Sequence, residues 1–342
     1  MVKLFGILIL SFLFTLILAL PFINLLYRLK FQRQDEKPKD IFDKDMPIFW
    51  RLHGWKKGTP TGGGILVIAA VLLLSVAFYL FTSFSPNNTS TILFFTVISF
   101  GFLGFYDDIQ KIFGWKKTGF WGLQVRYKLI IQLALSFLIS YYLYFTLNIT
   151  GFSIPLIGSS YFLNLGFSFI PFSMMVITFM TNAYNITDGL DGLAVGLLII
   201  TLAAFWHLNT LFGYGDIAVF ITTLLGSLLA FLYFNIYPAR VWLGDTGAMS
   251  FGALLVVIAL ILDQFVPLIF IGGVFVIEAL SSLIQWFSKA YFRKKVFECA
   301  PIHHHFEAKG WDETKVTMRF WLLGGVLAFI GIFLALLPSL KF

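Results

Sequence analysis

The chain has 342 residues, of which 59% are hydrophobic and 12% are charged, and its formal net charge is +7. Soluble domains contain about 25% charged residues, so this composition, with a mean hydropathy of +0.88, excludes an ordinary soluble protein. The sequence lacks the alternating ~10-residue segments of an outer-membrane barrel, and the single cysteine, Cys299, excludes an internal disulfide. We therefore predict an all-α polytopic membrane protein that forms one integral-membrane domain over residues 1–342.

Ten apolar segments are predicted to cross the membrane, since a spanning helix needs about 20 residues. The first is longer than the ~7–15-residue apolar core of a signal peptide, and no small-residue cleavage site follows it, so we expect it to be retained. The fifth and eighth segments are short for a full crossing. The predicted spans are residues 4–27, 62–84, 92–110, 127–147, 169–184, 192–210, 217–236, 248–262, 266–288 and 318–338.

Lysine and arginine residues orient these spans, because cytoplasmic loops are enriched in them. If the first span ends on the cytoplasmic side, the 24 lysines and arginines all fall on that side except Lys3 and Lys341 at the termini. An even number of spans then places both termini outside. On the outer side, residues 149–168 are predicted to form a small hairpin or an interfacial segment. The cationic inner loops are residues 28–61, 111–128, 237–247 and 289–319.

A polar run, Asn-Ala-Tyr-Asn-Ile-Thr-Asp-Gly-Leu-Asp-Gly, occupies residues 182–192 between apolar segments. Its two carboxylates, Asp188 and Asp191, are costly so close to a membrane unless they face water, a metal or a cationic ligand. On a helix they would share one face. Asn185 and Thr187, like Asp188, are residue types that cap the start of a helix. A polar loop between two helices is the alternative interpretation.

A glycine-rich run opens the second span, from Lys56 and Lys57 through Thr61 to Gly64. Glycines beside lysines let backbone N–H groups and cations approach a phosphate. The run does not match the Walker A pattern. A basic membrane anchor followed by a flexible helix entry explains it equally well.

Adjacent carboxylates, Asp107 and Asp108, close the third span, and Lys111 follows one turn later. Two acids at a helix C-terminus oppose the helix dipole and repel each other. A purely structural role explains this poorly. The pair suits Mg²⁺ coordination or general-base catalysis.

The loop between the seventh and eighth spans supplies a third acidic candidate, Asp245. In the same loop, Trp242 is a flat ring on which a nucleobase could stack. From its position alone, we favour the alternative that Trp242 belongs to an interfacial aromatic belt.

Three consecutive histidines, His303, His304 and His305, lie in the last inner loop. Their imidazoles are expected to donate hydrogen bonds to phosphate or carbonyl oxygens, and a solvated surface run is the alternative. Within the ninth span, Glu278 and Gln285 lie seven residues apart on one helical face. For Glu278 we expect a buried polar network rather than catalysis.

Together, these groups describe a phosphoryl-transfer centre in which carboxylates hold Mg²⁺ and cations surround it. The sequence contains no nucleotide-hydrolysis motif, so the phosphates should belong to the substrates. The residues concerned are the carboxylates Asp107, Asp108, Asp188, Asp191 and Asp245, the lysines Lys56, Lys57, Lys111, Lys116, Lys117 and Lys128, and the three histidines.

In content and order, these motifs resemble the phospho-N-acetylmuramoyl-pentapeptide transferase branch of the polyprenyl-phosphate N-acetylhexosamine-1-phosphate transferase superfamily. The acidic motifs are shared across the superfamily, whereas the triple histidine with Phe-Glu and Lys-Gly-Trp is typical of this branch. The chain departs from the family's usual residues at Gly62, at Trp242-Leu243 and at Ala248. The resembling motifs begin at Lys57, Asp107, Asn182, Asn235, Gly244, Val276, Pro301 and Lys309.

The resemblance implies a ten-helix enzyme of the bacterial inner membrane, with periplasmic termini and a cytoplasmic active site. It would transfer phospho-MurNAc-pentapeptide from UDP-MurNAc-pentapeptide to undecaprenyl phosphate, giving lipid I and UMP for peptidoglycan synthesis. Mg²⁺ is the implied cofactor and a homodimer the implied assembly, with no nucleic acid partner.

The catalytic residues are expected to be Asp107, Asp108 and Asp245. Either member of the pair would deprotonate or position the lipid phosphate, and Asp245 is the first choice for Mg²⁺, with the pair as alternatives. A direct transfer and a two-step route through an aspartyl-phosphate both remain open. The expected substrate-binding residues are Lys57, Thr61, Lys111, Lys128, Asn182, Asn185, Asp188, Asp191, Asn235, Trp242, Gln285, His303, His304 and His305.

Two other functions compete with this hypothesis. One is a sibling enzyme that loads GlcNAc-1-phosphate from UDP-GlcNAc onto the same lipid. The other is a transporter for an anionic lipid. Transporter sites lie near the bilayer midplane between internal repeats, whereas here the acids gather at one membrane surface and no internal repeat is found.

Overall fold

The computed structural model describes residues 2–32, 56, 58–81, 86–113, 125–213 and 215–340. Lys57, Lys116 and Lys117 therefore lie outside the described residues. The helices are α1 (Val2–Arg28), α3 (Gly63–Phe81), α4 (Asn88–Phe113), α5 (Val125–Phe145), α6 (Phe169–Thr187), α7 (Leu193–Phe212), α8 (Gly215–Asn235), α9 (Gly244–Ile261), α10 (Phe265–Ile271), α11 (Gly273–Phe287), α12 (Ile302–Ala308) and α13 (Glu313–Leu336).

Among the described residues, eight helices are long and apolar enough to cross a membrane, and the bent pair α10 and α11 makes a ninth if it counts as one span. α3 adds a shorter apolar stretch, Gly63–Phe78. Each apolar segment predicted from the sequence coincides with one of these elements. The chain is a multi-pass, mainly helical membrane protein.

Helix α9 is the centre of the bundle. Its side chains are buried without interruption from Thr246 to Leu260, as expected of a helix that is apolar on every side. Glycines bring its neighbours unusually close. A Cβ at Gly104 of α4 would lie 2.1 Å from the backbone oxygen of Asp245, and one at Gly64 of α3 would lie 2.3 Å from the backbone nitrogen of Gly247. These contacts place the C-terminal end of α4 beside the first turn of α9.

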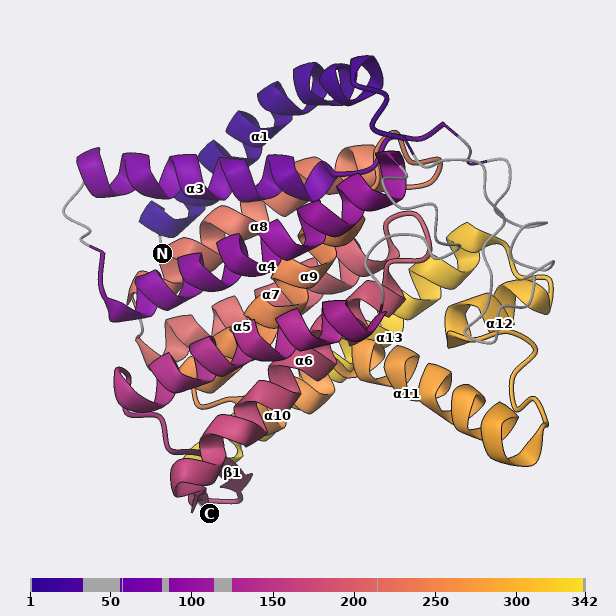
Figure 1. The fold of residues 1–342 in the computed structure, drawn as a ribbon. Helices are drawn as coiled ribbons and strands as arrows, with labels where there is room; N and C mark the ends of the chain where they lie inside the picture. Colours follow the sequence, from indigo (N-terminus) through magenta and orange to yellow (C-terminus); the bar gives the residue numbers. More distant parts are fainter. Residues whose placement is uncertain are drawn as a thin grey trace.

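The predicted span 266–288 is not one straight helix. It breaks at Gly272 into α10 and α11, whose axes differ by 75°. Figure 1 shows α11 leaning away from the bundle towards α12. An apolar segment of spanning length predicts that a helix exists, but two glycines inside it allow the axis to turn without interrupting the apolar pattern.

The two described strands, β1 (Gly151–Leu156) and β2 (Ser159–Asn164), form an antiparallel hairpin. This confirms the hairpin predicted within residues 149–168. Asp263 holds the hairpin to the bundle by accepting a 2.7 Å hydrogen bond from the Ser153 backbone N–H. The hairpin lies at the same end of the molecule as both chain termini, on the left of Figure 1, and α12 lies on the right.

Candidate functional site

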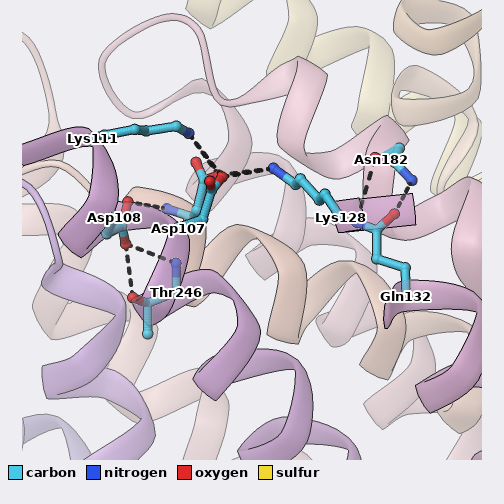
Figure 2. Close-up of polar contacts among 8 residues, drawn as sticks. Asp107, Asp108, Lys111, Lys128, Gln132, Asn182 and Thr246 are labelled. Atoms are coloured by element: carbon cyan, nitrogen blue, oxygen red, sulfur yellow. Dashed lines mark hydrogen bonds and ion pairs between the residues drawn. The ribbon is translucent and has the colours of Figure 1, made fainter. Parts of the chain in front are cut away.

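Two carboxylates and two lysines from three helices meet at the end of α4. Lys111 Nζ lies 2.7 Å from Asp245 Oδ2 and 3.2 Å from Asp107 Oδ2. Lys128 Nζ, from α5, lies 2.9 Å and 3.0 Å from the same two oxygens. Figure 2 shows both ammonium groups pointing at this pair. The two positive charges compensate the two negative ones, which makes a buried pair of carboxylates tolerable.

Asp108 has a different set of neighbours from Asp107. Its Oδ1 accepts a 3.0 Å hydrogen bond from the backbone N–H of Asp245, and its Oδ2 accepts hydrogen bonds from the backbone N–H and the hydroxyl of Thr246, at 3.0 and 2.8 Å. Thr61 lies beside this contact, since its Oγ1 is 2.8 Å from where a Cβ on Gly244 would stand. The structure therefore brings Asp107, Asp108 and Asp245 together.

The turn between α6 and α7 differs from the sequence-based expectation. Asn185 and Thr187 belong to the last turn of α6, and Asp188 is its C-cap, so the prediction that they cap a helix start is wrong. Helix α7 begins at Leu193, and its N-cap is Gly192 in the left-handed conformation at φ +74°. A positive φ favours glycine there. The alternative interpretation, a polar loop between two helices, describes this turn better.

The carboxyl group of Asp188 titrates far above an ordinary aspartate. Burial raises its pKa most, and the negative charges of Asp245, Asp108 and Asp191 raise it further, while His303 acts in the opposite direction. The resulting pKa is about 7. Asp188 is therefore close enough to three other acids for their charges to influence it, so the separate acidic motifs of the sequence share one electrostatic neighbourhood.

Asp191 joins four segments of the chain. Its carboxylate forms a 2.7 Å ion pair with Lys56 and accepts hydrogen bonds from Trp242 Nε1 at 3.1 Å and from the backbone N–H of Ala239 at 3.0 Å. Glu313, at the start of α13, pairs with the same Lys56 and accepts a 2.7 Å hydrogen bond from the backbone N–H of Asp191. This network holds Trp242 through its indole N–H, and the ring itself is partly buried.

His303 is fully buried on α12. Its Nδ1 lies 2.9 Å from Glu278 Oε2, so the acid within α11 belongs to the buried network expected for it. Its Nε2 has no hydrogen-bond partner among the described residues and packs against Gly189, where a Cβ would come within 2.5 Å. His303 thus lies directly against the turn that carries Asp188.

The other two histidines are also engaged by protein groups. His304 Nδ1 lies 2.7 Å from Glu307 Oε2 on the same helix. His305 Nδ1 accepts a 3.2 Å hydrogen bond from the backbone N–H of Glu298. Contact of these imidazoles with a phosphate or a sugar stays a prediction.

The side-chain amides of Asn182 and Asn235, both predicted to bind substrate, donate hydrogen bonds to other protein groups. Asn182 donates a 2.9 Å hydrogen bond to Gln132 Oε1, one helical turn from Lys128 (Figure 2). Asn235 donates a 2.9 Å hydrogen bond to the backbone oxygen of Val241 and so shapes the loop before α9.

Gln285 uses both ends of its amide on the backbone of a neighbouring loop. Its Oε1 accepts hydrogen bonds from the N–H groups of Val296 and Phe297 at 2.9 and 3.0 Å, and its Nε2 donates to the Phe297 oxygen at 2.8 Å. Contact between Gln285 and a substrate stays a prediction.

Asp107 and Asp245 suit a Mg²⁺ ion by their chemistry. No group of three or more His, Cys, Asp or Glu side chains forms a ready-made metal site in the described part of the chain. Mg²⁺ does not need one, because it usually takes one or two carboxylates and completes its shell with water and substrate phosphates. The lysines already held by these carboxylates show that the position is suited to positive charge.

Sequence reasoning missed three residues of this site: Glu313, Gln132 and Thr246. Glu313 resembles an ordinary first-turn acid of a helix, and its pairing with Lys56 joins positions far apart in sequence. Gln132 stands four residues after Lys128, which is a signal that could have found it.

Comparisons with known proteins match most of the chain. The family described as Glycosyl transferase family 4 matches residues 90–263. A phospho-N-acetylmuramoyl-pentapeptide-transferase of Geobacillus sp. (strain WCH70) is 38% identical over 331 residues, which span 95% of this chain and 96% of the relative. Those of Thermodesulfovibrio yellowstonii and Clostridium beijerinckii are each 37% identical, over 94% and 96% of this chain and 90% and 95% of the relatives.

Proposed function

Since the chain belongs to the phospho-N-acetylmuramoyl-pentapeptide-transferase family, we propose that it transfers phospho-MurNAc-pentapeptide from UDP-MurNAc-pentapeptide to undecaprenyl phosphate, producing lipid I and UMP. The observation that carries this proposal is similarity along nearly the full chain, at 38% identity in the Geobacillus relative. The similar region includes the cluster of carboxylates and lysines.

The chemistry requires two anions to react. An oxygen of the lipid phosphate attacks the phosphorus next to the sugar, a new phosphorus–oxygen bond forms, and the bond to UMP breaks with its electrons leaving on the nucleotide. The barrier is largely electrostatic and positional. Lys111 and Lys128, which are 2.7 and 2.9 Å from Asp245, are placed to exchange a carboxylate for phosphate oxygens when substrates enter.

In this proposal Asp245 and Asp107 hold Mg²⁺. When bound, the ion supplies charge neutralisation for the diphosphate. Asp107 positions the lipid phosphate and takes up any proton it carries. The Asp191 network holds the loop of Trp242, on which the uracil ring would stack. The sugar of the nucleotide substrate would lie against His303, His304 and Asn185.

The proposal extends to location and assembly. The enzyme lies in the bacterial inner membrane with both termini in the periplasm, and the end of the bundle that carries Asp107 and Asp245 faces the cytoplasm. Lys111 and Lys128 lie at that end, and lysine-rich ends of membrane proteins usually face the cytoplasm, which supports this orientation. The active assembly is proposed to be a homodimer.

The test is release of UMP by the purified protein in detergent, with and without Mg²⁺. UDP-MurNAc-pentapeptide and UDP-GlcNAc are offered in parallel with undecaprenyl phosphate. We expect UMP only from the first nucleotide and only with a divalent cation. Release from UDP-GlcNAc alone, or no release from either, would refute the proposal. Incubation with nucleotide alone, followed by a search for phosphorylated enzyme, separates the two-step route from direct transfer.

A further inference from the structure

The first turn of α9 lacks a capping side chain of its own. Leu243 occupies the N-cap position and makes no side-chain hydrogen bond. The first amide groups of a helix have no partner within the helix, so they need an acceptor from elsewhere. Asp108 of α4 provides it, because its carboxylate accepts the backbone N–H groups of both Asp245 and Thr246 and also the Thr246 hydroxyl.

The packing around this cap leaves little room for rearrangement. Gly244 has φ +77°, and a Cβ there would lie 2.8 Å from Asp108 Oδ2. On the α4 side, Gly104 lies directly against the backbone oxygen of Asp245. Asp108 is also buried, at 3% relative exposure. The distance between α4 and α9 is therefore fixed by backbone contacts, with Asp108 as the polar link.

The adjacent carboxylates Asp107 and Asp108 therefore have different roles. Asp107 faces the two ammonium groups. Asp108 forms no ion pair with a lysine of the described residues, and its two oxygens accept three hydrogen bonds from α9, out of roughly four that a carboxylate can accept. A negative charge at a helix N-terminus also complements the helix dipole. Because both of its carboxylate oxygens are bonded to donors of α9, Asp108 is suited to holding this helix rather than to attacking phosphorus.

We propose that Asp108 and Thr246 are positioning residues: they cap α9 from outside its own sequence and so aim Asp245 at Lys111 and Lys128. The consequence for catalysis rests on the proposed function, but the cap itself does not. Asp107 and Asp108, which the sequence predicted as a catalytic pair, then have separate roles. Asp107 belongs to the reaction centre, whereas Asp108 acts through Asp245.

Amide hydrogen exchange tests the cap without any substrate or metal. The full-length protein in detergent with EDTA is compared with Asp108→Asn, Thr246→Val and Asp107→Asn by mass spectrometry of peptides covering residues 240–250. We expect faster exchange in Asp108→Asn and, to a smaller extent, in Thr246→Val, which loses only the hydroxyl. Thr246→Ser should restore the protection, and Asp107→Asn should match the parent protein. Unchanged exchange in both Asp108→Asn and Thr246→Val would overturn the proposal.

The Mg²⁺ dependence of UMP release then tests the link to Asp245. Removing a group that orients a metal ligand typically weakens metal affinity about 10- to 100-fold. We expect Asp108→Asn to raise the half-saturating Mg²⁺ concentration by that factor and to recover turnover at high Mg²⁺, and Thr246→Val to do so more mildly. Asp107→Asn should lose turnover at every Mg²⁺ concentration.

Lost turnover in Asp108→Asn with an unchanged Mg²⁺ requirement would assign Asp108 to the chemistry and refute the positioning role. If Asp108→Asn fails to fold, the hydrogen exchange and the Mg²⁺ requirement of Thr246→Val decide whether the cap positions Asp245. If the parent protein releases no UMP, the proposed function fails, yet the exchange data still decide whether Asp108 caps α9.

Discussion

At the scale of single residues, Lys128 contributes a positive charge from a helix that brings no carboxylate to the cluster. It lies within 3.0 Å of both Asp107 and Asp245, so it compensates negative charge before and during phosphoryl transfer. We expect Lys128→Gln to lower turnover about 10²- to 10³-fold, as removal of one preorganised stabilising group does. The measurement is UMP release at saturating Mg²⁺.

Arg126 on the same helix provides the matched control for that experiment. Its guanidinium lies over the ring of Tyr127, 4.7 Å from the centroid, and its side chain is exposed. Arg126→Gln removes the same charge from α5 at an exposed position and should keep turnover near that of the parent. Equal losses in Arg126→Gln and Lys128→Gln would show that only the general charge of α5 matters.

Asp188 gives the site a pH-dependent stability. Its pKa in the folded protein is about 7, against an ordinary value of 3.8, so the folded state binds its proton more tightly than the unfolded state. The carboxyl group costs no stability below about pH 4. The cost grows as pH rises from about 4 to 7 and is constant above that. We expect the stability gained by Asp188→Asn to grow over this range and then level off, as measured by thermal unfolding in detergent with EDTA.

The exposed Glu298 is the control for that pH series, because Glu298→Gln also removes an acid next to the site. Its stability relative to the parent should stay flat between pH 5 and 8. A flat profile for Asp188→Asn as well would mean that Asp188 ionises normally and is not crowded by other acids.

At the scale of helices, one face of α11 holds the segment that carries the histidines. Glu278 pairs with His303, the hydroxyl of Ser281 accepts the backbone N–H of Ile302 at 3.0 Å, and Gln285 binds the loop before α12. The other face of α11 exposes apolar residues such as Leu283, which is 51% exposed. The helix that leaves the bundle at a bend therefore supports α12 and the loop before it through its polar face.

Glu278→Ala tests this support. It would leave the Nδ1 of a fully buried His303 without an acceptor, which costs about 1–3 kcal/mol of the free energy of unfolding. Glu278→Gln keeps an acceptor and should cost less. Thermal unfolding together with UMP release measures both effects. Ser282→Ala is the control on the same helix, since its buried hydroxyl has no hydrogen-bond partner in the part of the chain that the structure describes, and we expect no effect.

At the scale of the whole molecule, the positions of the long apolar helices followed from apolar run length alone, and the hairpin from its residue mixture. The short helix α12 did not follow, since its residues were expected to form a loop. The bend at Gly272 did not, because the apolar pattern continues through it. The meeting of the Asp107 pair with Asp245 was expected from chemistry. The partners of Asp191 were not, since the contact between Lys56 and Glu313 depends on how α13 is placed. Sequence patterns report local periodicity, whereas these contacts depend on how distant helices pack.

The close packing of α4 on α9 leads to a last prediction, which joins fold and site. Gly104→Ala would put a Cβ 2.1 Å from the backbone oxygen of Asp245 and 2.4 Å from its carbonyl carbon, so the helices must separate. Overpacking of this kind costs about 1–3 kcal/mol of stability, and the separation would also move Asp107 from Asp245. We expect a lower unfolding temperature and a larger loss of UMP release than the loss of folded protein explains. Gly325→Ala in α13, where nothing lies within 4 Å of the new Cβ, should leave both unchanged. If Gly104→Ala behaves like Gly325→Ala, backbone contact between α4 and α9 is not what holds the carboxylates together.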